Sequence, residues 1–85
     1  MAEFLIELYA SRGSAAAVEH VAKLASAAAA ELSLEGTPVR FVRSLFVPED
    51  ETCFYLYEAD SSEAVREAAR RAGLPAERIA EAVST

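Results

Sequence analysis

The residues of this chain that could carry out chemistry are few, and their types allow the binding of a metal ion more readily than catalysis. His20 is the only histidine and Cys53 the only cysteine. Imidazole and thiolate are preferred ligands of late divalent transition metals, and carboxylates give weaker support. The chain has no His-x-x-His or Cys-x-x-Cys pair, however, so the spacing predicts no tight site. The alternatives are that His20 is a solvated helix residue and Cys53 a small buried one.

An acidic turn is a second candidate for holding a cation. Glu49, Asp50 and Glu51 follow one another between two predicted strands, and three carboxylates at a hairpin tip can hold a divalent ion loosely. A solvated acidic loop is the alternative interpretation. The chain has 14 acidic against 8 basic residues and a net charge of −6, which favours cationic partners. Nucleic acid and anionic membrane surfaces both need a basic face, so we expect neither as a partner.

The sequence lacks the motifs of common enzymes. Its three glycines are isolated, which excludes a Gly-rich phosphate loop, and one histidine without a G-x-S-x-G context gives no catalytic triad. We therefore expect no enzyme activity. A single cysteine cannot form an internal disulfide, and the sequence shows neither a signal peptide nor an apolar run of about 20 residues. The expected location is the cytoplasm.

Six elements must position these candidate residues. Alternating apolar residues predict strands, two stretches with a helical apolar stripe predict helices, and a glycine follows each helix. Ser14 is the predicted N-cap of the first helix, and Asp60 with Glu63 forms a predicted capping box for the second. The predicted strands span residues 3–9, 39–47, 52–58 and 79–83, and the predicted helices span residues 15–34 and 61–72.

The order of these elements, β-α-β-β-α-β, predicts an α+β fold. It is a ferredoxin-like two-layer sandwich with an antiparallel sheet, built as a single domain over residues 1–85. Both helices then cover one face of the sheet, and strand alternation leaves the other face open. The residues assigned to the covered face are Phe4, Ile6, Leu8, Phe54 and Leu56. Those assigned to the open face are Glu3, Leu5, Glu7, Tyr9, Cys53, Tyr55 and Tyr57.

The second strand can lie in either of two registers. We favour the one that leaves the open face mostly apolar, with Arg43 beside Glu7. An apolar face of this size is not expected to remain exposed to solvent on a monomer, so we predict a symmetric homodimer that stacks two open faces. The favoured register puts Phe41, Arg43, Leu45 and Val47 on the open face, and the other puts Arg40, Val42, Ser44 and Phe46 there.

The polar groups of the predicted open face allow two interpretations. One is a small-molecule pocket, and the other is a satisfied network in which Glu7 pairs with Arg43 and tyrosine hydroxyls complete the bonding. The pocket leads to an alternative function, a dimeric α+β barrel enzyme or small-molecule binder, by fold analogy alone. A plain interaction module that regulates another chain is a third hypothesis. The groups concerned are Glu7, Arg43, Cys53, Tyr55 and Tyr57.

Two segments resemble a family of small bacterial ferredoxin-like proteins to which nickel binding is assigned. They are V-R-F-V-R-S-L-F-V-P-E-D-E-T-C-F (Val39 to Phe54) and E-A-V-R-E-A-A-R-R-A-G-L-P-A-E-R-I (Glu63 to Ile79). The resemblance extends over nearly the whole chain. It implies a dimeric ferredoxin-like fold, nickel as the bound ion, and a non-enzymatic role in nickel sequestration or buffering.

The chain departs from this family at two positions. Many relatives have a histidine where this chain has Arg43, and another where it has Ala68. If nickel binding carries over, the resemblance implies that His20, Glu3 or Glu7, and the acidic turn serve instead. Such a site would lie at the surface and be shared between subunits.

Overall fold

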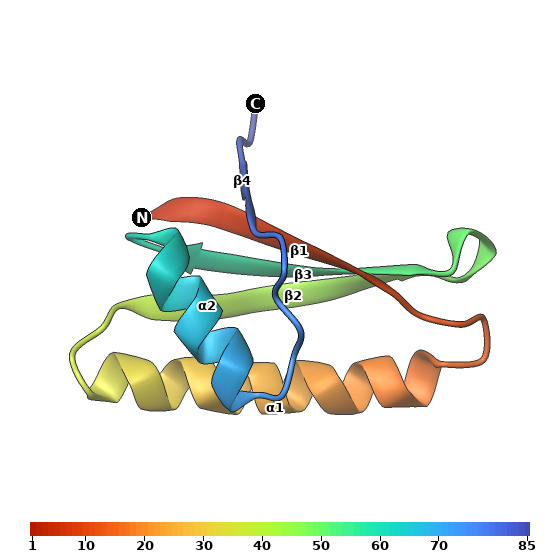
Figure 1. Ribbon diagram of the computed structural model, residues 1–85, viewed down its shortest axis with the longest axis horizontal. Coiled ribbons are helices and arrows are strands. Elements are labelled where there is room, and N and C mark those ends of the chain that lie inside the picture. Colours follow the sequence, from red (N-terminus) through yellow and green to blue (C-terminus); the bar gives the residue numbers. More distant parts are fainter.

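Four strands and two helices follow the predicted order (Figure 1). The computed structural model describes all residues from 1 to 85. The strands are β1 (Ala2–Tyr9), β2 (Val39–Val47), β3 (Thr52–Ala59) and β4 (Ala80–Ala82), and the helices are α1 (Ala15–Leu34) and α2 (Ser62–Arg71). A short 3-10 turn, Pro48–Asp50, joins β2 to β3. The predicted ends of the elements differ from these by at most one residue.

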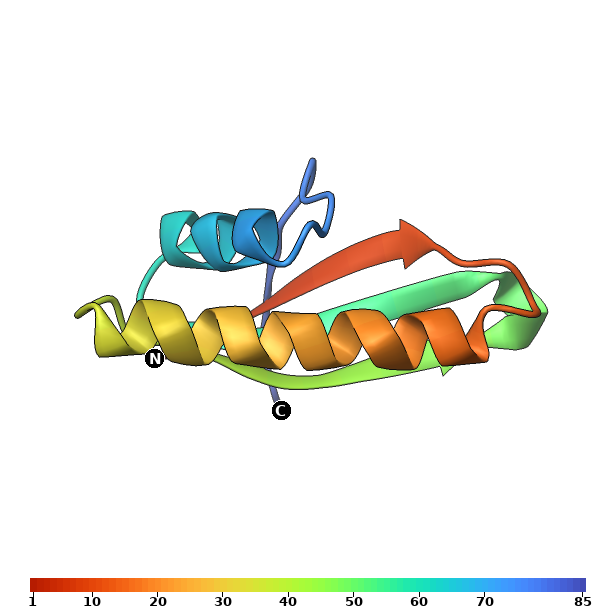
Figure 2. The ribbon, with the colours of Figure 1, turned by 90° about the horizontal axis from the view of Figure 1, so that it is seen from below.

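The sheet is antiparallel throughout and has the strand order β2-β3-β1-β4. Both helices lie on one side of it, as the view from below shows (Figure 2). This arrangement is the ferredoxin-like α+β sandwich that the sequence predicts. Neither helix is both long enough and apolar enough to cross a membrane.

Both helices end at a glycine in the left-handed conformation, as predicted. Gly36 has a φ of 103° and Gly73 a φ of 72°. After Gly73 the chain turns back, so that the Leu74 N–H donates to the Ala69 carbonyl at 2.9 Å. This bond satisfies a carbonyl that the helix end would otherwise leave free.

The helix starts differ from the prediction. Ser61, not Asp60, is the N-cap of α2, and its hydroxyl accepts a hydrogen bond from the Ala64 N–H at 3.2 Å. Because α2 begins one residue later than expected, Glu63 is not in the third helical position, and the predicted capping box is wrong. Ser14 precedes α1 but bonds to another serine hydroxyl of its turn at 2.6 Å instead of capping the helix.

The covered face of the sheet differs from the prediction in β3. Ile6 of β1 lies opposite Tyr55, and opposed residues of paired strands share a face. The prediction is wrong here because both faces of β3 are apolar, so alternation alone did not identify the buried one. Buried alanines of both helices leave room for the tyrosine rings. The covered face of β3 carries Cys53, Tyr55 and Tyr57, and its open face carries Phe54 and Leu56.

β2 follows neither of its two predicted registers throughout, because a β-bulge lies between Phe41 and Arg43. A bulge adds one residue to a strand and reverses the faces of the residues that follow it. Before the bulge, Phe41 faces the helices and Arg40 the open side. After it, Arg43, Leu45 and Val47 face the open side, as the favoured register predicts.

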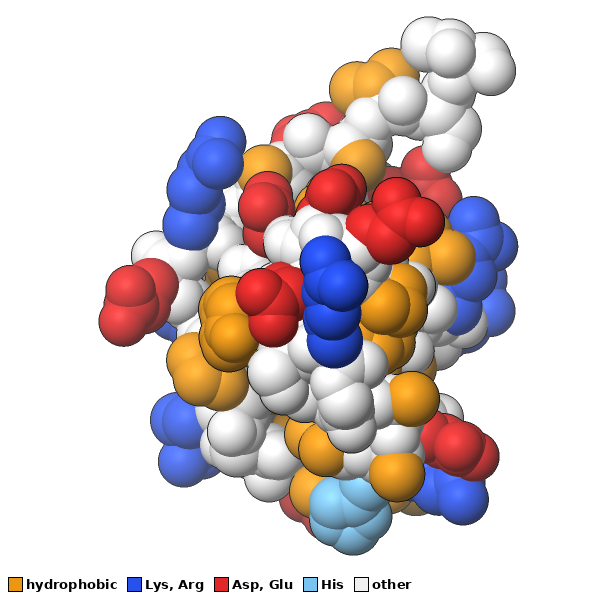
Figure 3. Space-filling view, turned by 90° about the vertical axis from the view of Figure 1, so that its right-hand side faces the viewer, with side chains coloured by type: hydrophobic (Ala, Val, Ile, Leu, Met, Phe, Trp, Pro, Cys, Tyr) orange, Lys and Arg blue, Asp and Glu red, His pale blue; other side chains and the backbone are white.

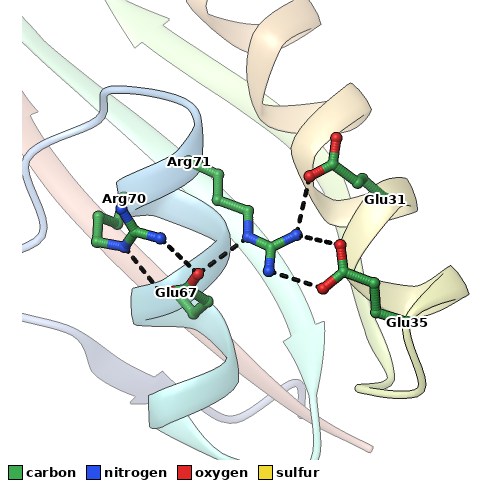
Figure 4. Close-up of polar contacts among 5 residues, drawn as sticks. All are labelled: Glu31, Glu35, Glu67, Arg70 and Arg71. Carbon is green, nitrogen blue, oxygen red and sulfur yellow. Dashed lines mark hydrogen bonds and ion pairs between the residues drawn. The ribbon is translucent and has the colours of Figure 1, made fainter.

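Five charged side chains tie α2 to the C-terminal half of α1 (Figure 4). Arg71 donates to Glu35 at 2.7 and 2.8 Å and to Glu31 at 2.9 Å. Within α2, Arg70 and Arg71 both donate to Glu67. These hydrogen bonds, first that of Arg70 and then that of Arg71, lower the pKa of Glu67 to about 2. Glu67 therefore keeps its charge far into the acidic range, and the network holds α2 over one half of α1.

Candidate functional site

The open face of the sheet is apolar at its centre. Leu56 of β3 lies directly beside Leu5 of β1, and Phe54 lies beside Leu45 of β2. Leu45 is 50 % exposed, and no element of the chain covers the four side chains. This central patch, made of Leu5, Leu45, Phe54 and Leu56, is the apolar surface that the predicted homodimer would bury.

The rim of the open face is charged, but its ion pair is not the predicted one. Glu7 and Arg43 oppose different residues of β3 and do not pair with each other. Instead, Arg40 donates two hydrogen bonds to one carboxylate oxygen of Glu58, at 2.9 and 2.5 Å. Glu7 and Arg43 are both exposed, and each is available to a partner.

A hollow of about 440 Å³ lies at one end of this face, beside the turn between β2 and β3. Its lining includes three acidic residues, Glu7, Asp50 and Glu51, together with Tyr9 and Arg78. Figure 3 looks onto this end of the molecule, where acidic side chains gather around a basic one and the histidine lies at the opposite edge. The structure thus brings together three predicted site residues with Arg78, which is not a predicted site residue.

Glu51 is the most firmly held of the three acidic turn residues. It has a left-handed φ of 48°, and one carboxylate oxygen accepts hydrogen bonds from the Tyr9 hydroxyl and the Arg12 N–H, both at 3.3 Å. The negative charge of Glu51 raises the pKa of Tyr9. Glu51 therefore joins the hairpin tip to the loop before α1, whereas Glu49 and Asp50 are exposed residues of the turn.

The predicted metal ligands do not converge within one chain. Glu3 lies about 20 Å along β1 from the acidic turn, and its carboxylate accepts a hydrogen bond from the Ser84 hydroxyl. His20 is exposed on α1, on the other side of the sheet from the hollow. Nowhere do three or more His, Cys, Asp or Glu side chains lie close enough together to hold a metal ion.

The two positions at which the resemblance implies histidines in relatives, Arg43 and Ala68, also lie apart in this chain. Arg43 is exposed on the open face, whereas Ala68 is fully buried on the inner side of α2. The sheet separates the two positions. Histidines at both could not share one ion within a single chain.

The sheet also divides the predicted open-face pocket. Glu7 and Arg43 lie on the open face, but Cys53, Tyr55 and Tyr57 lie beneath the helices, so the five residues cannot line one cavity. Cys53 has no exposed surface, and burial raises the pKa of its thiol. It is a protonated core residue, in agreement with the alternative interpretation of the sequence.

The Tyr57→Phe substitution is expected to stabilise the protein. Tyr57 has no exposed surface, and its hydroxyl is a buried group without a hydrogen-bond partner. Its ring packs edge-on against Phe41 at a centroid distance of 5.2 Å, a contact that phenylalanine retains. Removing the unpaired hydroxyl should raise the free energy of unfolding by about 1 kcal/mol, measured by urea denaturation. Tyr55→Phe is the control, because the Tyr55 hydroxyl has the Cys53 thiol as a partner and is not an unpaired buried group.

The same substitution should also change the stability at alkaline pH. Burial raises the pKa of Tyr57 from 10.0 to about 12. The phenol ionises at lower pH in the unfolded chain than in the folded one. The contribution of neutral Tyr57 to the free energy of unfolding is therefore fully present below pH 10 and is lost between pH 10 and pH 12. Tyr57→Phe should lose less stability than the unsubstituted chain over this interval. An equal or lower stability of Tyr57→Phe at neutral pH would show that the hydroxyl has a partner.

Comparisons with known proteins agree with this fold. Residues 4–82 match the family described as nickel responsive, SCO4226-like proteins. The chain is also similar to the crystal structure of SCO4226 from Streptomyces coelicolor A3(2), with 28 % sequence identity, a TM-score of 0.73 and 99 % of each chain covered. No curated protein matches it. Because the family match extends over nearly the whole sequence, the chain belongs to the SCO4226-like family of nickel responsive proteins.

Proposed function

We propose that this chain is a non-enzymatic nickel-binding protein that acts as a cytoplasmic homodimer, in nickel sequestration or buffering. Membership of a family named for its nickel response is the observation that carries the nickel part of this proposal. The uncovered central patch supports the homodimer, because burying it against its own copy removes apolar surface from water on both subunits. The non-enzymatic part rests on the absence of catalytic motifs from the sequence.

The donor groups of one chain do not fit a preformed nickel site. Nickel prefers imidazole nitrogen, and the single imidazole, that of His20, belongs to no group of three or more donors that could hold a metal ion. The carboxylates of Glu49 and Asp50 are exposed on the other side of the sheet. We therefore propose weak binding at the surface, with His20 as the main ligand and the acidic residues adding a favourable electric field.

Isothermal titration of the tag-free protein tests this proposal. Nickel is expected to bind saturably, with a dissociation constant in the micromolar range, and magnesium to give little heat because it prefers oxygen ligands. His20→Ala should weaken nickel binding about tenfold, which corresponds to about 1.4 kcal/mol. Zinc, which also prefers imidazole, should follow nickel in both proteins.

Two controls separate the candidate ligands. Ser26→Ala changes another exposed residue of α1 and should leave nickel binding unchanged. A double variant, Glu49→Gln with Asp50→Asn, should weaken binding less than His20→Ala does. A larger loss in the double variant would move the site to the acidic turn, and nickel heat no greater than that of magnesium would overturn nickel binding altogether.

A further inference from the structure

A groove lies on the covered side of the sheet, between the first half of α1 and the turn that follows α2. α1 has 20 residues and α2 only 10, which makes them about 30 and 15 Å long. The charged network holds α2 against the C-terminal half of α1, so the N-terminal half has no helix beside it (Figure 2). The space that remains has a volume of about 500 Å³, within the range of small-molecule pockets.

The walls of this groove are apolar and carry no charge. They include Leu8 from β1, Val18 and Val21 from α1, and Leu74 from the turn after α2. Val18 and Leu74 are 7 % and 4 % exposed, so the walls belong to the packed core. No acidic or basic side chain lines the groove, which disfavours a charged ligand because nothing there would offset its desolvation.

One buried polar side chain reaches the groove. Tyr55 lies in its lining and is 4 % exposed. Within the chain its hydroxyl bonds only to the Cys53 thiol, whose sulfur is a weak hydrogen-bonding group. Unlike the hydroxyl of Tyr57, it is therefore not a buried group without any partner. Burial, and then the hydrogen bond with Cys53, raise the pKa of Tyr55. The phenol is therefore neutral and can donate a hydrogen bond to whatever enters.

We propose that this groove binds a small, neutral, largely apolar molecule with one carbonyl-type acceptor, placed on the Tyr55 hydroxyl. The apolar walls favour such a ligand by burying its hydrocarbon surface. The acceptor offers the hydroxyl a stronger hydrogen bond than the Cys53 sulfur does, because sulfur is a weak acceptor. The groove and the proposed nickel ligands share no residue, so either proposal can fail without the other.

A pair of probes of the same shape tests the position of the acceptor. Acetylnaphthalene carries a carbonyl, and ethylnaphthalene has a methylene in its place. In NMR titrations of the full chain, the ketone is expected to bind about fivefold more tightly, because one neutral hydrogen bond to a carbonyl replaces the weaker one to sulfur. Tyr55→Phe should abolish this preference and leave the binding of ethylnaphthalene unchanged.

Two variants at the start of α1 test the position of the groove itself. Ala17 is exposed and lines the groove, whereas the exposed Ala16 does not. Ala17→Phe should fill the groove and prevent binding of both probes, and Ala16→Phe should have no effect. The proposal is overturned if neither probe binds, if Tyr55→Phe keeps the preference for the ketone, or if Ala17→Phe behaves like Ala16→Phe.

Discussion

The Phe54→Lys variant is expected to sediment as a folded monomer of about 9.1 kDa, whereas the proposed homodimer of the unsubstituted chain should sediment with twice that mass. Phe54 lies in the central patch of the open face and is not part of the core beneath the helices. In the proposed homodimer, the two-fold axis places two new ammonium groups in one apolar interface. An unpaired buried charge costs about 3 kcal/mol or more, so the dimer dissociation constant should rise at least about a hundredfold.

Leu34→Lys is the matched control for this experiment. Leu34 is 90 % exposed at the end of α1, away from the open face, so a lysine there should leave the dimer intact. Circular dichroism spectra of both variants should match that of the unsubstituted chain. A monomeric unsubstituted chain at micromolar concentration, or a Phe54→Lys variant that stays dimeric, would contradict a dimer formed through the open face.

The elements of the fold could be predicted because their signals are local in the sequence. Gly36 and Gly73 end the two helices in the left-handed conformation that glycine adopts most easily. The turn at Pro48 is similarly evident from a few adjacent residues. A local signal needs no knowledge of what lies across the sheet, which explains why the element ends agree so closely with the structure.

The faces of β2 and β3 could not be predicted in the same way, because they depend on pairing between distant segments. Both faces of β3 are apolar, and only its register with β1, which sets Tyr55 opposite Ile6, identifies the buried one. The bulge after Phe41 has no glycine or proline to mark it. One extra residue then reverses the remainder of β2, so a single period-two pattern could not describe the strand.

The candidate sites also divide into features that adjacent residues predict and features that depend on distant segments. The acidic turn is a run of adjacent residues, and it lies at the surface as predicted. The hollow beside it depends on Arg78, which approaches from the segment before β4. The groove at Tyr55 depends on the unequal lengths of two helices and on the network around Arg71 that places them. These are tertiary relations that no motif in the sequence records.

The Ile6→Ala variant should show the second large effect, a loss of about 2 to 5 kcal/mol in the free energy of unfolding. Ile6 is 1 % exposed at the centre of the covered face, opposite Tyr55. Truncation leaves a cavity that stiff β-strands and close-packed helices cannot fill by relaxing. A domain of this length has a total stability of roughly 4 to 13 kcal/mol, so the variant should lie close to the limit of folding. Urea denaturation measures the change.

Two comparisons make this result specific to the covered face. Ile6→Val removes one methyl group and should cost only about 0.5 to 1.5 kcal/mol. Leu5→Ala changes the adjacent residue, which points to the open face, and should cost less than half as much as Ile6→Ala. All three substitutions should be made and measured in the Phe54→Lys variant, because dimerisation would otherwise add a concentration-dependent contribution to stability. If Leu5→Ala lowers the free energy of unfolding as much as Ile6→Ala does, the folded monomer depends on the open face as much as on the core. The central patch would then stabilise the monomer and would not serve mainly as the interface with a second subunit.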